Sequence, residues 1–412
     1  MSEERLIHFQ KACENSAFSS LREETRLFLE EKALSHRFSF SQIQQLIIIA
    51  IDLQMWNALA LELFWEEKGT SKETFLSLQK RYESLKNGLK CYEQSPHNFQ
   101  KESFHIEEVE KTSLGLGSCP VASPKTRCCN LMTLDAVESC GFDCSYCSIQ
   151  SFYKNNTITF DKHFAKKLEN LALEPSKTYH IGTGQSSDSL MWGNRAGVLE
   201  ALLDFAKKHP NVILEFKSKS DNIGYLLEHD VPKNVICTWS LNPQMIIDHE
   251  EQRTASLQAR IQSARALADK GVLVGFHFHP IVLFEGWQEA YKTIIAQLTS
   301  TFSSKEVALV SMGTLTFIKS VLKKIRLRAQ KSKILQMPLC DANGKYSYPL
   351  AQKKEMFATL YQAFKPWHHE VFFYLCMEDE SLWKDVFGYE FANNEAFEEA
   401  MLQAYINKIQ SK

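Results

Sequence analysis

The sequence predicts an α/β protein built as a (β/α) barrel, partial or complete, with a helical domain in front of it. From residue 131 onward, short apolar runs alternate with stretches of helical periodicity, the pattern of βα units around a parallel sheet. Residues 1–92 instead carry helical patterns throughout. Three closely spaced cysteines follow the first apolar run, at the kind of strand end where such barrels collect their chemistry.

The bulk composition is that of an ordinary water-exposed globular protein. The 412 residues are 44% hydrophobic and 23% charged, and they suffice for one large domain and a smaller one. The formal net charge of -2 creates no global field toward nucleic acid, so any such contact requires a local basic patch. The most apolar stretch, residues 46–51, is too short to cross a bilayer. We expect a monomer without a membrane anchor.

The first 130 residues divide into a helical domain and a connecting segment. Ser41 is expected to cap a long amphipathic helix, and Thr70 with Glu73 forms a capping box for the next one. The helical pattern gives way near residue 93 to a stretch rich in Ser, Pro, Gly and Lys. We therefore place a helical domain at 1–92 and a linker or strap at 93–130.

Six apolar runs predict the parallel strands of the barrel, and a later run is expected to pair at an edge. The six runs are residues 131–137, 178–183, 212–218, 235–241, 272–279 and 307–312. The later run covers residues 371–377. The barrel domain is accordingly placed at 131–377, followed by an acidic, helical C-terminal extension at 378–412.

The cysteine triplet is the most informative motif in the chain. Cys140, Cys144 and Cys147 have Cys-x3-Cys-x2-Cys spacing, so three thiolates can wrap a soft metal centre from one short loop. Three ligands leave a [4Fe-4S] cluster one short. The open iron can then bind S-adenosylmethionine (SAM) and reduce its sulfonium, which releases a 5′-deoxyadenosyl radical. This spacing, with the aromatic Tyr146 before the last cysteine, resembles the radical SAM superfamily.

A structural zinc site is the alternative interpretation of the triplet. Zinc needs four protein ligands, and Cys119, Cys128 or Cys129 could supply the fourth. A disulfide framework is disfavoured, because eleven cysteines in 412 residues are not dense and no signal peptide is recognisable. Since an oxygen-labile cluster belongs in a reducing compartment, we expect a cytoplasmic location.

Polar residues recur at the ends of the later runs. Three runs carry them on one face at a spacing of two: Glu215, Lys217 and Lys219; Thr238, Ser240 and Asn242; His277 and His279. Taken singly, such a lysine is usually solvated and such a histidine is usually a hydrogen-bonded core group. Their repetition at successive strand ends predicts that these side chains converge on one cavity.

Residues 131–318 resemble the spore photoproduct lyase family of radical SAM enzymes. The motifs that carry the resemblance are Gln-Ser-Ser-Asp at 185–188, Lys-Ser-Lys at 217–219, Trp-Ser-Leu-Asn at 239–242, Gly-Phe-His-Phe-His-Pro-Ile at 275–281 and Glu-Gly-Trp at 285–287. The resemblance implies a partial barrel of six parallel strands, a [4Fe-4S] cluster on the triplet with SAM on its free iron, and an electron donor such as flavodoxin or ferredoxin.

The resemblance also assigns roles to single residues. Tyr146 would lie near the adenine and take part in catalysis, and the backbone at His279 would border the adenine. The remaining cofactor-binding residues implied by the family are Ser187, Asp188, Lys219, Ser240 and Asn242. These types suit the task, because a carboxylate is bound by an amine or a hydroxyl, and ribose hydroxyls by Asn and Ser.

Two positions depart from the pattern of the lesion-repair enzymes in this family. Gln185 stands where they carry the cysteine that donates a hydrogen atom to the product radical, and Ser148 replaces a tyrosine that relays it. Cys376 is a candidate replacement thiol if the last strand reaches the cavity, but an inert, buried cysteine is the favoured interpretation. We therefore expect little or no clean reversal of spore photoproduct.

A basic run after the sixth strand bears on whether DNA is bound. Its seven cations are Lys319, Lys323, Lys324, Arg326, Arg328, Lys331 and Lys333. They could grip a phosphate backbone, but no aromatic platform for bases lies nearby, so a solvated helix face is favoured. Three functions stay open: radical chemistry on a nucleic-acid lesion, radical modification of a peptide or small molecule, and a cluster-bearing regulatory protein that makes no radical.

Overall fold

The protein is known here from a computed structural model that describes residues 3–14, 16–93, 103–119, 125–149, 157–328, 330–342 and 344–411. The chain divides into two compact units. The first comprises Met1–His97, Leu283–Glu285 and Thr316–Pro349, and the second comprises Asn98–Val282, Gly286–Leu315 and Leu350–Lys412. Within the described ranges, no helix combines the length and apolarity that crossing a bilayer requires.

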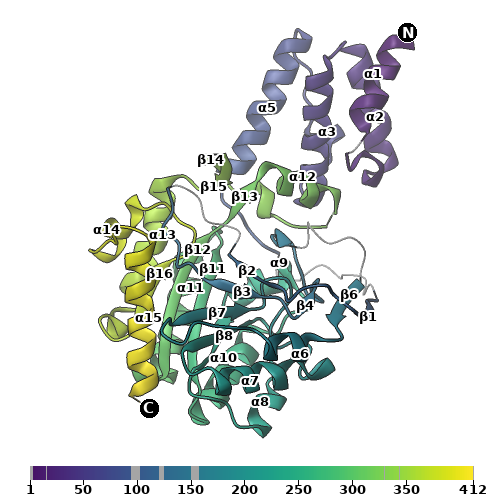
Figure 1. Cartoon of the computed structure of the whole chain (residues 1–412). Coiled ribbons are helices and arrows are strands. Elements are labelled where there is room, and N and C mark those ends of the chain that lie inside the picture. The colour runs from purple at the N-terminus through teal and green to yellow at the C-terminus, as the bar shows by residue number, and fades with distance from the viewer. Residues whose placement is uncertain are drawn as a thin grey trace. The chain divides into compact units, whose positions relative to one another are not determined.

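The second unit is built on an eight-stranded sheet that curls into a half-barrel (Figure 1). In spatial order the strands are β16 (Phe372–Leu375), β12 (Val307–Thr314), β11 (Leu273–Ile281), β9 (Val235–Ser240), β8 (Val212–Ser218), β7 (Tyr179–Thr183), β3 (Met132–Leu134) and β2 (Leu116–Ser118). Every neighbouring pair is parallel except β2 and β3. The predicted α/β class and partial barrel are confirmed.

The strands form where the apolar runs predict them, because both faces of this sheet are covered. All residues of β9 and β12 are buried, as expected of parallel strands that read as continuous apolar runs. The run 371–377 pairs as an edge strand, β16 on β12, as predicted. The run 131–137 is shorter than expected: β3 ends at Leu134, and β4 (Val137–Glu138) joins another sheet.

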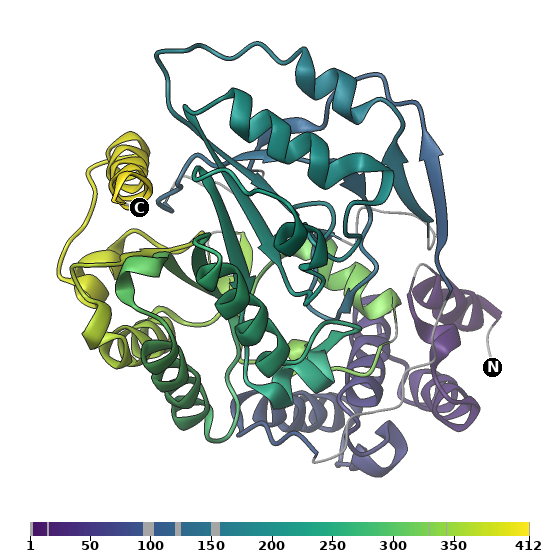
Figure 2. The same ribbon diagram turned by 90° about the horizontal axis from the view of Figure 1, so that it is seen from below.

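Helices follow the strands and cover the outer face of the half-barrel (Figure 2). They are α6 (Phe164–Glu169), α7 (Val198–Lys208), α8 (Gly224–Glu228), α10 (Leu257–Asp269), α11 (Trp287–Thr301) and α13 (Leu350–Ala363), with α14 (Ser381–Phe387) after β16. The short α9 (Gln244–Glu250) instead contacts β10 (Glu251–Gln252). The amphipathic α7 shows the principle, since it buries Leu199, Leu202 and Phe205 and exposes its charged residues.

The strap and the C-terminal extension are both part of this unit. Within the strap, β2 pairs with β3, and β1 (His105–Val109) lies parallel to β6 (Thr157–Asp161) in a three-stranded sheet with β4. The extension ends in α15 (Asn394–Gln410), which runs beside β12 and β16 (Figure 1). Its buried Tyr405 ring packs edge-on against His180 of β7, at a centroid distance of 5.4 Å. A helix from the end of the chain thus lines the interior of the half-barrel.

The first unit holds the expected N-terminal helices. They are α1 (Glu3–Cys13), α2 (Glu23–Ser35), α3 (Phe40–Met55), α4 (Leu61–Phe64) and α5 (Ser71–Asn87). Thr70 accepts a hydrogen bond from the Glu73 backbone at 3.2 Å, as the predicted cap requires. The cap of α3 is Ser39 with Gln42 rather than Ser41, because the helix begins before Ser41.

The segment 316–349 also belongs to the first unit, although the barrel domain was expected to run unbroken over 131–377. It contributes α12 (Lys319–Leu327), the hairpin strands β13 (Thr316–Ile318), β14 (Cys340–Ala342) and β15 (Lys345–Ser347), and the short helix η5 (Ile334–Gln336). The reason is a buried ion pair. Arg326 of α12 donates from Nε and Nη2 to the Asp52 carboxylate of α3, at 2.8 and 2.9 Å.

Candidate functional site

The cysteine loop is fixed by backbone pairing with a segment more than 100 residues later. The short strand β5 (Asp143–Cys144) pairs antiparallel with β10 (Glu251–Gln252). The Ser145 amide donates to the Glu250 carbonyl at 2.9 Å, and the Cys147 amide donates to the Cys144 carbonyl at 3.1 Å. These bonds set the backbone from which Cys144 and Cys147 project.

The start of the loop is shaped by a close approach at Gly141. A Cβ atom there would lie 2.4 Å from Met191 Cε and 3.0 Å from the Trp192 ring, so a larger residue would displace one of them. Met191 also lies against Cys140, with its Sδ 4.0 Å from the Cys140 Sγ. A glycine between the first two cysteines therefore lets this part of the loop pack on the segment after β7.

A cavity of ≈ 140 Å³ lies where β7, β8 and β9 end, next to the cysteine loop. Its lining includes all three triplet thiols and five of the cofactor residues implied by the family: Cys140, Cys144, Cys147, Tyr146, Ser187, Asp188, Lys219 and Ser240. Gln185 and Lys217 line it as well. The predicted convergence of polar strand ends on one cavity is thus seen for β8 and β9.

The donor set of this cavity fits a cluster that lacks one protein ligand. In the described part of the chain, no three His, Cys, Asp or Glu side chains are arranged to share one metal ion. A [4Fe-4S] cluster makes a different demand, because each thiolate binds a separate iron at its own corner. Three thiols from one loop that face a common cavity, with Lys219 on the same wall, suit that demand.

Asp188 links two of the strand ends that border the cavity. Its carboxylate accepts hydrogen bonds from the backbone amides of Leu190, Met191 and Lys219, at 3.0, 3.0 and 2.7 Å, and from the Ser218 hydroxyl at 2.7 Å. Burial raises the pKa of Asp188, although these four donors oppose the shift. Because its acceptor sites are occupied, Asp188 acts as a brace between the loops after β7 and β8.

Lys219 and Ser187 are held at the cavity by neighbouring aromatic side chains. The Lys219 Nζ lies 5.8 Å from the centroid of the Tyr146 ring, within cation–π range. The Ser187 hydroxyl oxygen accepts a hydrogen bond from Trp192 Nε1 at 3.0 Å. This leaves the Ser187 hydroxyl hydrogen available to a ligand, and the Lys219 ammonium faces the same space.

Glu251 is the centre of a buried network behind the cysteine loop. Its carboxylate accepts hydrogen bonds from the Tyr146 hydroxyl and from Asn242 Nδ2, the latter at 2.7 Å, and forms an ion pair with Arg260 at 2.7 Å. Burial alone would raise the pKa of Glu251, but Arg260 and Lys219, with these hydrogen bonds, lower it to about 2. Burial and the Glu251 charge in turn raise the pKa of Tyr146, so its phenol stays protonated and donates.

Two of the expected SAM contacts are not at the cavity. Asn242 is fully buried, and its amide oxygen accepts a hydrogen bond from Tyr291 at 2.6 Å while its nitrogen donates to Glu251. A ribose contact from Asn242 would have to replace one of these bonds. His279 also lies outside the lining, and its ring packs so closely on Gly313 that a Cβ there would lie 2.8 Å away.

Deeper in the half-barrel, the inward-facing polar residues form a second buried network. The Glu215 carboxylate of β8 accepts hydrogen bonds from His180 at 2.9 Å, His277 at 2.8 Å and Thr238 at 2.7 Å. Since a carboxylate only accepts, His277 donates from Nε2, and its Nδ1 accepts from the Ser311 hydroxyl. Four strands, β7, β8, β9 and β11, meet at this single carboxylate.

The charges of this network are set by burial and mutual contact. Burial would raise the pKa of Glu215, but hydrogen bonds and charge from His180 and His277 outweigh it and hold the pKa well below its usual range. Burial lowers the pKa of His277 to about 4, and the Lys217 ammonium contributes to the shift. At neutral pH the network therefore consists of an anionic Glu215 and a neutral His277.

Four of the eight cysteines outside the triplet gather at a separate place in the same unit. Cys119, Cys128, Cys129 and Cys376 border one small cavity of ≈ 20 Å³, apart from the triplet. A hydrogen bond from Cys129 lowers the pKa of Cys128 to about 6, whereas burial raises the pKa of Cys376 to about 12, against the opposing charge of Lys217. Lys217 therefore lies close enough to affect Cys376 and also lines the triplet cavity. The upstream cysteines that were considered as a fourth zinc ligand thus lie beside Cys376 instead.

The basic run is not a uniform cationic face. Arg326 forms an ion pair with Asp52 within the first unit, whereas Lys319, Lys323 and Lys324 are exposed on α12. Val321 and Ile325 are the buried positions of this helix. The favoured prediction of a solvated helix face is thus correct for the three lysines and wrong for Arg326.

Several residues at the site could not be found from the sequence. Glu251, Arg260 and Trp192 belong to no motif of the chain, and they reach the site only because distant loops pair. His180 carried a weak signal, since it is a polar residue inside an otherwise apolar run. Gln185 and Ser148 lie where the departures from the family were noted, and Gln185 lines the cavity.

Comparison with known proteins identifies the family. The family model for spore photoproduct lyase matches residues 133–366. Spore photoproduct lyases of Clostridium acetobutylicum and of Geobacillus sp. are 25% identical over 180 residues and 24% identical over 183 residues, which is 42% and 43% of this chain. These matches cover 53% and 52% of the two relatives, so the chain spans about half the length of the curated relatives it matches.

Solved structures show the same fold. A spore photoproduct lyase complexed with dinucleoside spore photoproduct superposes with a TM-score of 0.55 at 18% identity, over 72% of this chain and 84% of that one. A doubly substituted spore photoproduct lyase with bound AdoMet and the same dinucleoside gives a TM-score of 0.54 over the same shares. The half-barrel, the triplet at its strand ends and the family match over more than half of the sequence agree, and the chain belongs to the spore photoproduct lyase family of radical SAM proteins.

Proposed function

We propose that this protein is a radical SAM enzyme that holds a [4Fe-4S] cluster on Cys140, Cys144 and Cys147. The observation that carries the proposal is the meeting of these three thiols with Lys219, Ser187 and Ser240 around one cavity at the strand ends. We infer in addition that it works as a monomer in the reducing cytoplasm, with a low-potential electron carrier such as flavodoxin or ferredoxin.

The side chains of the cavity divide the work of holding the cofactor. A cluster held there with one open iron would bind SAM and supply the electron that cleaves its sulfonium bond. The Lys219 ammonium offers a charge-assisted contact to the carboxylate of SAM, and the Ser187 and Ser240 hydroxyls offer hydrogen bonds. Tyr146 supplies an aromatic face for the adenine, held in place by its hydrogen bond to Glu251.

For the substrate we propose a thymine-type DNA lesion. We propose further that the Cys376 thiol returns the hydrogen atom to the product radical. Two relatives of the same fold hold dinucleoside spore photoproduct, and this chain keeps the family's cofactor residues. Gln185 cannot give up a hydrogen atom as a thiol can. Two observations support Cys376 as the hydrogen donor. Its raised pKa keeps the thiol protonated at neutral pH, and Lys217, which affects that pKa, also lines the triplet cavity.

The cluster assignment is tested by anaerobic reconstitution. We expect the wild-type protein to bind four irons and to cleave SAM to 5′-deoxyadenosine and methionine when reduced with dithionite, even without substrate. Cys144→Ala should lose the cluster, whereas Cys119→Ala should retain it. A Cys144→Ala protein with full iron content and thiolate-to-iron absorbance would overturn the assignment, and a wild-type protein that yields no deoxyadenosine would point to a regulatory role.

The role of Lys219 is tested in the same preparation. Lys219→Ala should weaken SAM binding by about tenfold while iron content stays unchanged, because it removes one charge-assisted contact of roughly 1.5–3 kcal/mol. Lys208→Ala, an exposed lysine of α7, is the matched control. Equal SAM affinity in the two variants would remove Lys219 from the cofactor site.

The substrate is tested with the synthetic lesion dinucleotide. Because Gln185 stands in place of the thiol donor, we expect thymine release that depends on SAM but is slow, and in Cys376→Ala we expect at least about tenfold slower release together with adducts from solvent or reductant. Cys340→Ala, an exposed thiol of the first unit, should behave as the wild type. SAM cleavage without any thymine release would refute the lesion as substrate and leave the radical SAM assignment intact.

A further inference from the structure

A second, larger cavity lies wholly within the first unit, away from the residues assigned above. Its volume is ≈ 770 Å³, in the range of sites that hold one small molecule. One wall is the face of α3 that carries Gln44, Ile47, Ile48 and Ile51, and the opposite wall is α12. The ends of α1 and α5 and the residues around η5 complete the lining.

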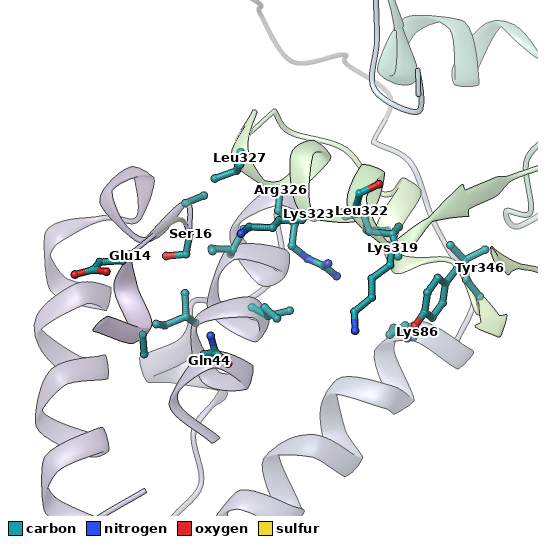
Figure 3. A pocket seen from close by; sticks show the side chains of 18 residues that line it. Glu14, Ser16, Gln44, Lys86, Lys319, Leu322, Lys323, Arg326, Leu327 and Tyr346 are labelled. Carbon is teal, nitrogen blue, oxygen red and sulfur yellow. The ribbon is translucent and has the colours of Figure 1, made fainter. Parts of the chain in front are cut away.

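The α12 wall carries cations at helical spacing. Lys319, Leu322, Lys323 and Arg326 recur at intervals of three and four, so they share one face of this helix, and all four line the cavity. Figure 3 shows the Lys319, Lys323 and Arg326 side chains reaching from α12 into the space above α3. Lys86, at the end of α5, adds a fourth cation to the lining.

The charges of the lining do not cancel. Arg326 is neutralised by the buried Asp52, and Lys86 lies 3.5 Å from the exposed Glu83. Within the described ranges, Lys319 and Lys323 have no carboxylate partner. The one acidic residue of the lining, Glu14, belongs to the α1 end, so the α12 side of the cavity attracts an anion.

Aliphatic side chains of the lining are open to solvent. Ile48 on the α3 wall is 37% exposed, and Leu327 at the end of α12 is 47% exposed, although both line a concave site. Ile47, Ile51, Leu335 and Leu339 extend the apolar surface. Tyr346 is the only aromatic residue among the lining residues, so bases of a nucleic acid would find almost no stacking surface there.

Because cations of α12 and aliphatic side chains line the same cavity, we propose that the first unit binds an amphiphilic anion. Such a ligand has a carboxylate or phosphate head group on an aliphatic body. The head group would lie between Lys319, Lys323 and Lys86, whose flexible amines suit a compact anion. The body would cover the isoleucines of α3, and each methylene buried there would strengthen binding. The proposal is independent of the radical chemistry, since it shares no residue with the triplet cavity.

The test measures binding to the reconstituted full-length protein. Decanoate and dodecyl phosphate are titrated against protein-bound anilinonaphthalene sulfonate, with decanol and inorganic phosphate as ligands that lack one half of the chemistry. We expect decanoate and dodecyl phosphate to displace the probe at concentrations at least about tenfold lower than decanol or phosphate. Sedimentation with phosphatidylglycerol vesicles tells whether the natural ligand is a membrane lipid or a soluble anion. Binding to the vesicles assigns a membrane lipid, and binding only to the dissolved amphiphiles assigns a soluble anion.

Two variants locate the site. Lys319→Gln with Lys323→Gln should weaken decanoate binding about tenfold or more, and Ile48→Glu should do the same by placing a negative charge in the aliphatic wall. The control pair Lys324→Gln with Lys331→Gln removes two charges of the same segment outside the lining and should change nothing. SAM cleavage serves as the check that all variants are folded.

Three results would overturn the proposal. The first is decanol binding as tightly as decanoate, which would show an unspecific apolar site. The second is equal affinity in the control pair and the two site variants. The third is displacement of the probe by a short oligonucleotide at lower concentration than by dodecyl phosphate, which would make this face a polyanion surface.

Discussion

At the scale of single residues, Glu215 shows how one buried carboxylate organises a barrel interior. It has less than a tenth of its surface exposed and is satisfied by three donors from three other strands. Replacing it by Gln removes the charge and one acceptor while it keeps the shape. We expect Glu215→Gln to lower the free energy of unfolding by about 2 kcal/mol or more, because hydrogen bonds to charged groups are worth roughly 1.5–3 kcal/mol each. Glu228→Gln, on the surface of α8, is the control, and chemical denaturation under anaerobic conditions is the measurement.

The same network predicts a pH dependence with a defined sign. The pKa of His277 is lowered from 6.5 to about 4, so between these values the unfolded chain binds a proton that the folded protein does not, and stability falls as the pH drops. The pKa of Glu215 is lowered below 4.5, so its contribution is present above 4.5 and is lost on further acidification. We expect the melting temperature to decline below pH 6.5 and more steeply below 4.5.

Glu215→Gln separates the two contributions. The melting temperature of this variant should still decline between pH 6.5 and about 4.5. Below pH 4.5 its decline should be shallower than that of the wild type, because the carboxylate that titrates there is gone. Thermal unfolding followed by circular dichroism from pH 7 to pH 4 measures both slopes. Parallel curves for the wild type and the variant below pH 4.5 would contradict the lowered pKa of Glu215.

At the scale of elements, the loop that carries the triplet depends on a close approach at Gly141. An alanine there would press on the Met191 methyl group, the movable end of a flexible side chain, and on the Trp192 ring, so the cost lies at the low end of overpacking, about 1 kcal/mol. We expect Gly141→Ala to retain less iron after reconstitution and to release it faster to a chelator. Gly224→Ala is the matched control, since a Cβ at Gly224 meets nothing within 4 Å. Equal iron retention in the two variants would show that the loop tolerates the displacement.

The joining of α12 to α3 depends on the fork of a single arginine. Arg326 makes two hydrogen bonds to the fully buried Asp52, which also accepts one from Tyr82 at 2.6 Å. A lysine keeps the charge but cannot make both bonds in this geometry. We expect Arg326→Lys to destabilise the protein by about 1–3 kcal/mol. Lys324→Ala should stay within about 0.5 kcal/mol, as surface substitutions do. If Arg326→Lys leaves the free energy of unfolding unchanged, the segment 316–349 is held by its apolar contacts.

At the scale of the whole molecule, the last helix completes the interior that the first strands begin. Tyr405 of α15 packs on His180 of β7 and on Phe372 of β16, so it touches two strands far apart in the order of the sheet. We expect Tyr405→Ala to cost about 3–5 kcal/mol, as large-to-small changes of buried aromatic residues do. Gln403→Ala, exposed on the same helix, should be close to neutral. If both variants unfold at the same denaturant concentration, the packing of α15 on the sheet does not contribute to stability.

The sequence by itself determined the fold class, the positions of the strands along the chain and the cysteine triplet. Parallel strands buried on both faces must be apolar throughout, so the runs at 178–183, 212–218 and 307–312 were legible without a structure. The triplet was legible because its three ligands lie within eight residues of one another.

Only the tertiary structure decided which distant residues support that site. Glu251 reaches Tyr146 across more than 100 residues and lies in no local pattern. In the first unit, Arg326 reaches Asp52 across more than 270 residues, and the basic run in which it lies does not indicate that partner. The grouping of Cys376 with Cys128 likewise follows from where β16 ends in the sheet. Local periodicity reports which side of an element is buried, whereas the partner it is buried against is fixed by the packing of the whole unit.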